Sequence, residues 1–165
     1  GQANINLLGT MGEGGYPAID RRFPGSFGSA YMYFVVPKVI LFRPEHSRRV
    51  FVDEVDFISA PGVSAPDVHR PGGPKFLVTE LCLMSFNAER ARFRLESVHP
   101  AHTVEEVRDN TGFDFDVADT VLVTPEPEAD HLNVLRSRVG VEIGNTYPGF
   151  ASRVFGIEPA KEAVA

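Results

Sequence analysis

The residues best suited to act on a ligand lie in the loop PGSFGSA, residues 24–30. Gly25 and Gly28 carry no side chain, so backbone N–H groups there could closely approach a phosphate or a carbonyl oxygen. The apolar segment that follows could form a helix that begins at this loop. A plain turn into a packed element explains the same glycines, and both interpretations stay open here.

Three nearby features suit ordinary loop roles. The stretch RPGGPKF, residues 70–76, has the composition of a turn before a strand. Glu13, in GEGGY, is interpreted as a solvated surface carboxylate. Arg21 and Arg22 lie beside the glycine loop and could bind a carboxylate, or could simply be solvated loop charges.

Several common chemistries have no sequence support. The five histidines are scattered without metal-ligand spacing and there is one cysteine, so we expect no metal site. The sequence contains neither a G-x-S-x-G nucleophile elbow nor a GxxxxGK[ST] phosphate loop. Cys82 lies in the apolar run KFLVTELCLMSF, which predicts a buried thiol in a reducing compartment.

Composition narrows the class of partner. A formal net charge of −6 over 165 residues argues against a surface for nucleic acids, which are bound by clustered Lys and Arg. No apolar run approaches the ~18 residues of a membrane span, and no signal peptide is visible. We therefore expect a single-domain cytoplasmic protein that binds neither nucleic acid nor membrane.

The strands that position these residues can be placed from periodicity. The segment KVILF, residues 38–42, is apolar on both faces, which is typical of a strand covered on both sides. In RARFRLESVHP, Phe93 and Leu95 alternate with charged residues, which predicts a half-exposed antiparallel strand in a small meander. Further short strands are expected at residues 5–8 and within residues 48–62.

Two helices have local signatures. Thr103 and Glu106 form a T-x-x-E capping box, and Asn110 or Gly112 ends that helix. In EADHLNVLRSRV, apolar residues recur on one helical face, which predicts a helix docked on the sheet. Residues beyond Gly140 are expected to be loop-like, with a frayed end after Pro159.

The order of motifs resembles the C-terminal part of the β subunit of family I CoA-transferases, of the glutaconate and 3-oxoacid type. That family's pattern is a G-N-x-N turn, a Gly-Gly-Ala loop, an E-H-S-K/R strand end followed by V-D-F-I-S, then G-G-P with V-T-D/E-L, and H-P-G-V-T-x-E-E-V-R-x-x-T-G. This chain carries, in the same order over roughly residues 1–138, the counterparts ANIN, PGSFGSA, EHSRR with VDFIS, GGPKFLVTEL and HPAHTVEEVRDNTG.

The departures from the pattern bear on chemistry. The first turn glycine of the family is Ala3 here, and the glycine loop reads Gly25-Ser26-Phe27-Gly28-Ser29-Ala30. The nucleophilic glutamate of the family lies in an E-N-G or E-S-G motif, which this sequence lacks, since Glu96-Ser97 is followed by Val98. The resemblance thus implies a β subunit without its first part, or a relative that dispenses with that glutamate.

The resemblance implies an α/β fold: an open, mostly parallel sheet with flanking helices and a small antiparallel meander. Residues 1–139 would form the β-subunit-like domain and residues 140–165 a C-terminal extension. The partner would be a CoA-transferase α subunit, in a hetero-oligomer such as α2β2, with the active site between the subunits.

The implied function is transfer of CoA between an acyl-CoA and a carboxylic acid through a glutamyl-CoA intermediate, with coenzyme A as substrate and no other cofactor. This chain would supply no catalytic residue. Its acyl-CoA-binding residues would be Asn4 and Asn6, through their side chains, and Gly25, Ser26 and Gly28, through close backbone approach. The alternatives are a CoA-thioester hydrolase of the steroid ring-degradation type, with a partner-chain carboxylate as base, and a non-catalytic structural subunit.

Overall fold

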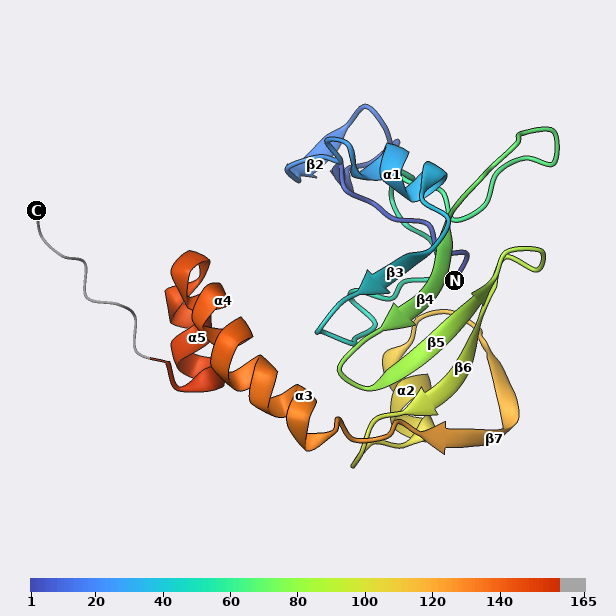
Figure 1. The fold of residues 1–165 in the computed structure, drawn as a ribbon. Coiled ribbons are helices and arrows are strands. Elements are labelled where there is room, and N and C mark those ends of the chain that lie inside the picture. The colour runs from blue at the N-terminus through green and yellow to red at the C-terminus, as the bar shows by residue number, and fades with distance from the viewer. Residues whose placement is uncertain (158–165) are drawn as a thin grey trace, which may run out of the picture. The chain divides into compact units, whose positions relative to one another are not determined.

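The computed structural model describes residues 1–157, which divide into two compact units at Thr124 and Pro125. The first unit holds all the strands, and the second, from Pro125 onward, is helical (Figure 1). The division falls beside the Pro-x-Pro sequence of Pro125 and Pro127. The boundary expected at residue 139, between the β-subunit-like domain and the C-terminal extension, stays a prediction.

The first unit is built on a five-stranded sheet in the order β3-β4-β5-β6-β7. Its strands are β3 Val39–Phe42, β4 Pro74–Val78, β5 Cys82–Asn87, β6 Arg92–Val98 and β7 Asp116–Val123. The pairs β3–β4 and β6–β7 are parallel, and β4–β5–β6 form an antiparallel meander. The expected α/β class with a meander is confirmed, and the sheet is mixed, with parallel pairs at both edges.

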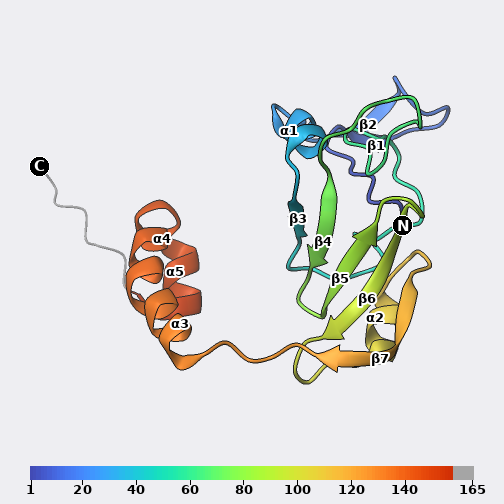
Figure 2. The ribbon, with the colours of Figure 1, turned by 45° about the vertical axis from the view of Figure 1, so that its right-hand side comes forward.

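One face of the sheet carries the core. Phe93 and Leu95 on β6 are buried while Arg94 between them is exposed, as the alternation predicted. Helix α2, Val104–Asn110, lies beside β6 and β7 in both views and buries Val107 completely (Figures 1 and 2). The buried side chains on this face also include Leu77, Cys82, Met84 and Phe86.

The opposite face of the sheet is open at β3. Ile40 is 56% and Phe42 70% exposed, and their register partners on β4, Phe76 and Val78, are only half-buried. The expectation that this strand is covered on both faces is therefore wrong for the described residues. Its apolar composition alone could not show that one side has no packing neighbour.

The N-terminal region forms a separate small sheet. Strands β1, Gly9–Met11, and β2, Ile19–Arg22, pair antiparallel. The strand expected at residues 5–8 is reduced to a single bridge between Ile5 and Ala60. No strand occurs within residues 48–62, because the backbone of this segment bonds elsewhere: the Phe51 N–H donates to the Ser47 carbonyl at 2.8 Å, and the Phe51 carbonyl accepts from the Gly112 N–H at 2.7 Å.

Helix α1, Ser29–Val35, follows the glycine loop, which was one of the two possibilities that the sequence left open. Tyr33 anchors the helix in the core, where its hydroxyl donates to the Ala3 carbonyl oxygen at 2.8 Å. Arg70 holds the same helix by donating to the Tyr33 carbonyl at 3.0 Å and to the Pro61 carbonyl at 2.7 Å. The glycine loop is thus attached to a helix fixed at its buried face.

The start of α2 shows half of the expected capping box. The Thr103 hydroxyl accepts a hydrogen bond from the Glu106 backbone N–H at 3.1 Å. The Glu106 carboxylate does not reach back to Thr103; it bonds to His102 Nδ1 at 2.9 Å. A histidine one turn earlier was available as a competing partner, and a pattern of Thr and Glu alone does not reveal it.

The second unit consists of α3 Ala129–Val134, the π-helical segment η1 Leu135–Val139, α4 Gly140–Thr146 and α5 Pro148–Phe155. The expected loop beyond Gly140 is wrong, because α4 and α5 occupy that segment. Gly140 is buried, and a Cβ there would lie 2.7 Å from Ile157 Cδ1, so this glycine permits close packing instead of ending a helix. Pro148 stands in the first turn of α5, where proline is tolerated.

Two expectations for this unit are not tested. Docking of the helix of residues 129–139 on the sheet stays a prediction, and the frayed end after Pro159 lies outside the described residues. Among residues 1–157, no helix combines the length and the apolar character needed to cross a membrane.

Candidate functional site

A cleft of about 1400 Å³ opens on the first unit beside its N-terminal segment. Its walls combine polar and apolar groups: Asn4 and Asn6 contribute amides, and Leu41, Leu77 and Phe93 contribute sheet residues. Both predicted ligand-binding asparagines therefore line one cavity. A large cleft with a few polar groups on apolar walls is the usual form of a small-molecule site.

Asn4 keeps a donor available in this cleft. Its Oδ1 accepts from the Gly62 N–H at 3.0 Å, and its Nδ2 lies 3.5 Å from Gln2 Oε1. An amide nitrogen carries two N–H groups, so at least one can serve a ligand. Gly62 is required for this arrangement, because a Cβ there would lie 2.1 Å from the Gln2 carbonyl oxygen.

Asn6 is engaged by the fold itself. Its Oδ1 accepts from the N–H groups of Leu8 and Gly9 at 3.0 and 3.2 Å, and its Nδ2 donates to the Gly9 carbonyl at 2.6 Å. These bonds form a side-chain-stabilised turn into β1. The binding role expected for Asn6 stays a prediction. Only one N–H of its Nδ2 remains free to bind a ligand.

The glycine loop lies against the same N-terminal segment. The Gly25 N–H donates to the Leu7 carbonyl at 3.0 Å, and the Phe23 N–H donates to the Leu8 carbonyl at 2.8 Å. The Ser26 carbonyl accepts from the Ser29 N–H at 2.8 Å, which closes the turn into α1. The fold therefore places the predicted glycine loop next to the segment that carries the asparagines, but Gly25, Ser26 and Gly28 do not line the cleft that Asn4 and Asn6 line.

The two glycines of the loop differ in what the fold requires of them. Gly25 has φ +94°, a conformation that disfavours side chains. Gly28 has φ −88°, and a Cβ there would meet nothing within 4 Å. Within the described residues, neither backbone nor packing requires glycine at position 28, so its open space is available to a ligand or a partner.

The side chains that the sequence analysis singled out show no sign of activation. Burial raises the pKa of the Cys82 thiol to about 11, against a smaller opposing effect of its bond with Thr79, so this group stays protonated near neutral pH. Glu13 is exposed in the turn between β1 and β2. Arg21 and Arg22 are exposed on β2. Residues 1–157 contain no group of three or more His, Cys, Asp or Glu side chains placed to hold a metal ion.

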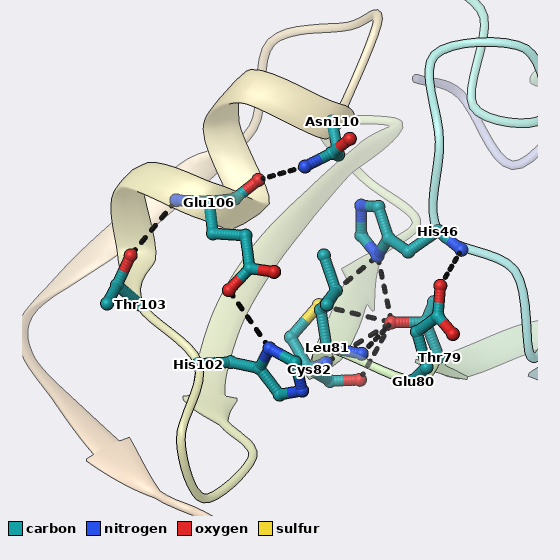
Figure 3. A network of polar contacts seen from close by, with 9 residues as sticks. All are labelled: His46, Thr79, Glu80, Leu81, Cys82, His102, Thr103, Glu106 and Asn110. Atoms are coloured by element: carbon teal, nitrogen blue, oxygen red, sulfur yellow. Dashed lines mark hydrogen bonds and ion pairs between the residues drawn. The ribbon is translucent and has the colours of Figure 1, made fainter.

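A buried polar network lies at the turn between β4 and β5 (Figure 3). The Thr79 hydroxyl accepts from the N–H groups of Leu81 and Cys82 at 3.1 and 3.2 Å and bonds to His46 Nδ1 at 2.8 Å. On its other side, His46 Nε2 bonds to the Thr111 hydroxyl at 2.9 Å. The network ties the loop after β3 to the β4–β5 turn and to the end of α2.

The network fixes the state of His46. Thr111 donates its only hydroxyl proton to the Val107 carbonyl at 2.6 Å, so it must accept from His46 Nε2–H. The Thr79 hydroxyl already accepts from the N–H groups of Leu81 and Cys82, so it donates its proton to Nδ1, and the imidazole is neutral. Burial, opposed by the charges of Glu80 and Glu106, lowers the pKa of His46 below its ordinary value, in agreement with this assignment.

A second histidine approaches the same threonine. His99 Nε2 bonds to the Thr79 carbonyl oxygen at 2.9 Å, and its Nδ1 bonds to the Thr124 hydroxyl at 2.9 Å. The histidines are scattered along the sequence, and this convergence was not predicted. The signal was present in the order of the E-H-S, V-T-E-L and H-P motifs, since each contributes one member of the network.

No family model matches the chain. Individual relatives do. The chain is 32% identical over 146 residues to the β subunit of 3-oxoadipate CoA-transferase of Pseudomonas knackmussii, a match that covers 83% of this chain and 56% of that protein. It is 30% identical over 138 residues to the β subunit of glutaconate CoA-transferase of Acidaminococcus fermentans, covering 77% and 51%. Over a shorter region of 97 residues it is 33% identical to the cholesterol ring-cleaving hydrolase IpdB subunit of Rhodococcus jostii, covering 56% and 38%.

Solved structures show the same relationships. The TM-score is 0.71 with Rhodococcus jostii IpdAB, at 28% identity, and 0.68 with the glutaconate CoA-transferase of Acidaminococcus fermentans, at 26% identity. It is 0.66 with the decarboxylase AibA/AibB, at 26% identity. Each match covers 81% of this chain and between 50% and 54% of the other. The chain thus spans about half the length of the relatives it matches, and it belongs to the family of the CoA-transferase β subunits.

Proposed function

We propose that this chain is part of the β subunit of a heteromeric CoA-transferase that moves CoA between an acyl-CoA and a carboxylic acid. The observation that carries the proposal is the 30–32% identity to two CoA-transferase β subunits over most of the chain. The partner would be the α subunit, in an assembly such as α2β2. Coenzyme A enters as substrate, with no separate cofactor, and the buried Cys82 thiol suits a reducing compartment such as the cytoplasm.

The reaction divides one acyl transfer into smaller steps. A glutamate carboxylate attacks the thioester carbonyl, and the CoA thiolate leaves, which gives a mixed anhydride. The thiolate then attacks the glutamyl carbonyl and releases the first carboxylic acid, leaving a glutamyl-CoA thioester. The same two steps in reverse, with the second acid as attacking group, pass CoA to the acceptor. The glutamate is assigned to a part of the enzyme outside this chain, because the sequence has no E-N-G or E-S-G motif.

This chain would form one wall of the acyl-CoA site. A tetrahedral oxyanion develops on the thioester carbonyl, and preorganised N–H donors aimed at it are worth about 3 kcal/mol each. The free N–H of Asn4 and the backbone of Gly25, Ser26 and Gly28 are the candidates. The open space at Gly28 supports this assignment, since a ligand could reach the backbone there.

Thioester hydrolysis is the second candidate. The similarity to the IpdB subunit, which is named as a ring-cleaving hydrolase, supports hydrolytic chemistry as the alternative. Water would replace the acid acceptor, and a carboxylate of the partner subunit would act as base. A subunit that only completes the assembly is the third candidate.

The test is acceptor dependence. The complete β chain, purified with its α partner, is given an acyl-CoA with and without an added carboxylate, and all CoA species are followed by mass spectrometry. Transfer predicts a new acyl-CoA that forms only with the acceptor. Release of free CoA without any acceptor would replace the transferase proposal with the hydrolase. No turnover of any acyl-CoA by an intact complex would contradict both.

A further inference from the structure

Phe27 combines two unfavourable features at the tip of the glycine loop. Its backbone has φ +46°, in the left-handed region, and its side chain is 90% exposed. The other residues at positive φ that are not glycine, within the described part of the chain, are Ala3, Ala91 and Ala101. Left-handed backbone is costly for a residue with a large side chain, and here no burial within the chain offsets that cost.

We propose that Phe27 is a specificity-determining residue whose ring packs against an apolar acyl group of the acyl-CoA substrate. The inference rests on the proposed function, since it requires an acyl-CoA at the glycine loop. It adds a preference for apolar over charged acyl groups. A ring covered by such a group would gain the apolar contact that the fold does not give it.

The position of Phe27 supports this role. It stands between Gly25 and Gly28, whose backbone is assigned to the thioester, so its side chain starts within one residue of the reacting group. A Cβ at either glycine would meet no atom within 4 Å, so the space beside the loop is open. Tyr31, on the first turn of α1, is also 70% exposed, while Tyr33 holds the helix in the core.

The experiment uses the purified complex of both subunits and three donors: butyryl-CoA, octanoyl-CoA and glutaryl-CoA, with acetate as acceptor. The variants are Phe27→Gly, which relieves the left-handed backbone and removes the ring, and Phe27→Leu, which keeps an apolar side chain. Leu122→Ala is the matched control, because Leu122 is a large apolar residue, 65% exposed, on the distant strand β7. Donor consumption, melting temperature and native mass are measured for each protein.

Phe27→Gly should lower kcat/KM for octanoyl-CoA about tenfold, as expected for loss of one good apolar contact, and change glutaryl-CoA less than about twofold. Phe27→Leu should recover part of the loss, and Leu122→Ala should behave as the wild type. The melting temperature of Phe27→Gly should not fall, because no buried surface is lost.

Three outcomes overturn the proposal. An unchanged ratio of octanoyl-CoA to glutaryl-CoA in Phe27→Gly, with an active wild type, overturns the role of Phe27 alone. Dissociation of the Phe27→Gly complex on native mass measurement assigns the ring to the interface between the two subunits instead. A wild-type complex that consumes glutaryl-CoA but neither butyryl-CoA nor octanoyl-CoA overturns the preference for apolar acyl groups, whereas the proposed function itself is contradicted only by the acceptor-dependence test above.

Discussion

The surroundings of Thr79 and the loop of residues 24–30 differ in how many of their contacts are made within the chain. Around Thr79 each group finds its partner inside the chain: His46 and His99 approach the same residue from two sides, and no buried side-chain nitrogen or oxygen in the described residues lacks a hydrogen bond. In the loop, Gly28 adjoins open space and Phe27 projects into solvent.

The difference shows that the sequence motifs shared with the family are of two kinds: some hold the fold together, and others have contacts left to make. The motifs of the Thr79 region identify the family because their residues interlock in a scaffold, and their contacts are complete without a ligand. The loop residues have contacts left to make. A short motif can therefore be specific for a fold without containing any group that touches a substrate.

The largest loss of stability is expected for substitutions in the buried hydrogen-bond network around His46 and Thr79. His46→Ala should lower the free energy of unfolding by about 3 kcal/mol, because it opens a cavity and removes the hydrogen bonds of the imidazole with the hydroxyls of Thr79 and Thr111. Thermal or denaturant unfolding of the purified complex measures it. His69→Ala is the matched control, since His69 is exposed and should change stability by less than about 0.5 kcal/mol. Equal stability of the two variants would contradict the claim that the network around His46 and Thr79 stabilises the fold.

The same network predicts a pH dependence. The pKa of folded His46 lies below the ordinary 6.5, so near and below that pH the unfolded chain binds a proton that the folded chain does not. The stability that neutral His46 contributes is present above about pH 6.5 and is lost as pH falls from there toward the lowered pKa, by at most about 1.4 kcal/mol per pH unit. His46→Gln should flatten the decline in melting temperature between about pH 7 and 5. Parallel curves for the two proteins would contradict the neutral assignment.

A smaller effect is expected at the start of α2. Thr103→Ala should cost about 1 kcal/mol, because the Glu106 N–H loses the hydroxyl that accepts from it. Thr103→Ser keeps that acceptor and should be close to the wild type. Unfolding measurements on both variants would sharpen the comparison, since this residue belongs to the same motif as His99 and yet lies at the surface. A loss as large as that of His46→Ala would contradict the distinction.

Local signals predicted the parts of the fold that depend on local rules. The alternation in β6, the hydroxyl cap at Thr103 and the buried Cys82 all follow from patterns within a few residues. The helix after the glycine loop was one of the possibilities that the sequence left open. These features need only the periodicity of one element or one capping bond.

The features that were missed depend on contacts distant in the sequence. Segment 48–62 has strand-like composition, but its backbone bridges other elements: the Phe51 carbonyl accepts from Gly112 N–H at 2.7 Å. Gly140 reads as a helix end, although it is a close-packing site inside a helical unit. For the candidate site, the residue order suggested its members, but only the fold shows that Asn6 holds its own turn through a 2.6 Å bond from Nδ2, while the Nδ2 of Asn4 makes only a 3.5 Å contact.

The assignment of the glycine loop to the acyl-CoA site is tested most directly by the rate of CoA transfer in Gly28→Ala, measured in the purified complex. Gly62→Ala is measured in parallel as a glycine that the fold requires. Gly28→Ala should keep the wild-type melting temperature, since its Cβ meets nothing within the chain, yet lose at least about tenfold in transfer rate because the Cβ separates the loop from the thioester. Gly62→Ala, in contrast, should lower the stability by about 1–3 kcal/mol, because its Cβ collides with the Gln2 carbonyl. Full transfer activity in Gly28→Ala would contradict the assignment of the glycine loop to the acyl-CoA site.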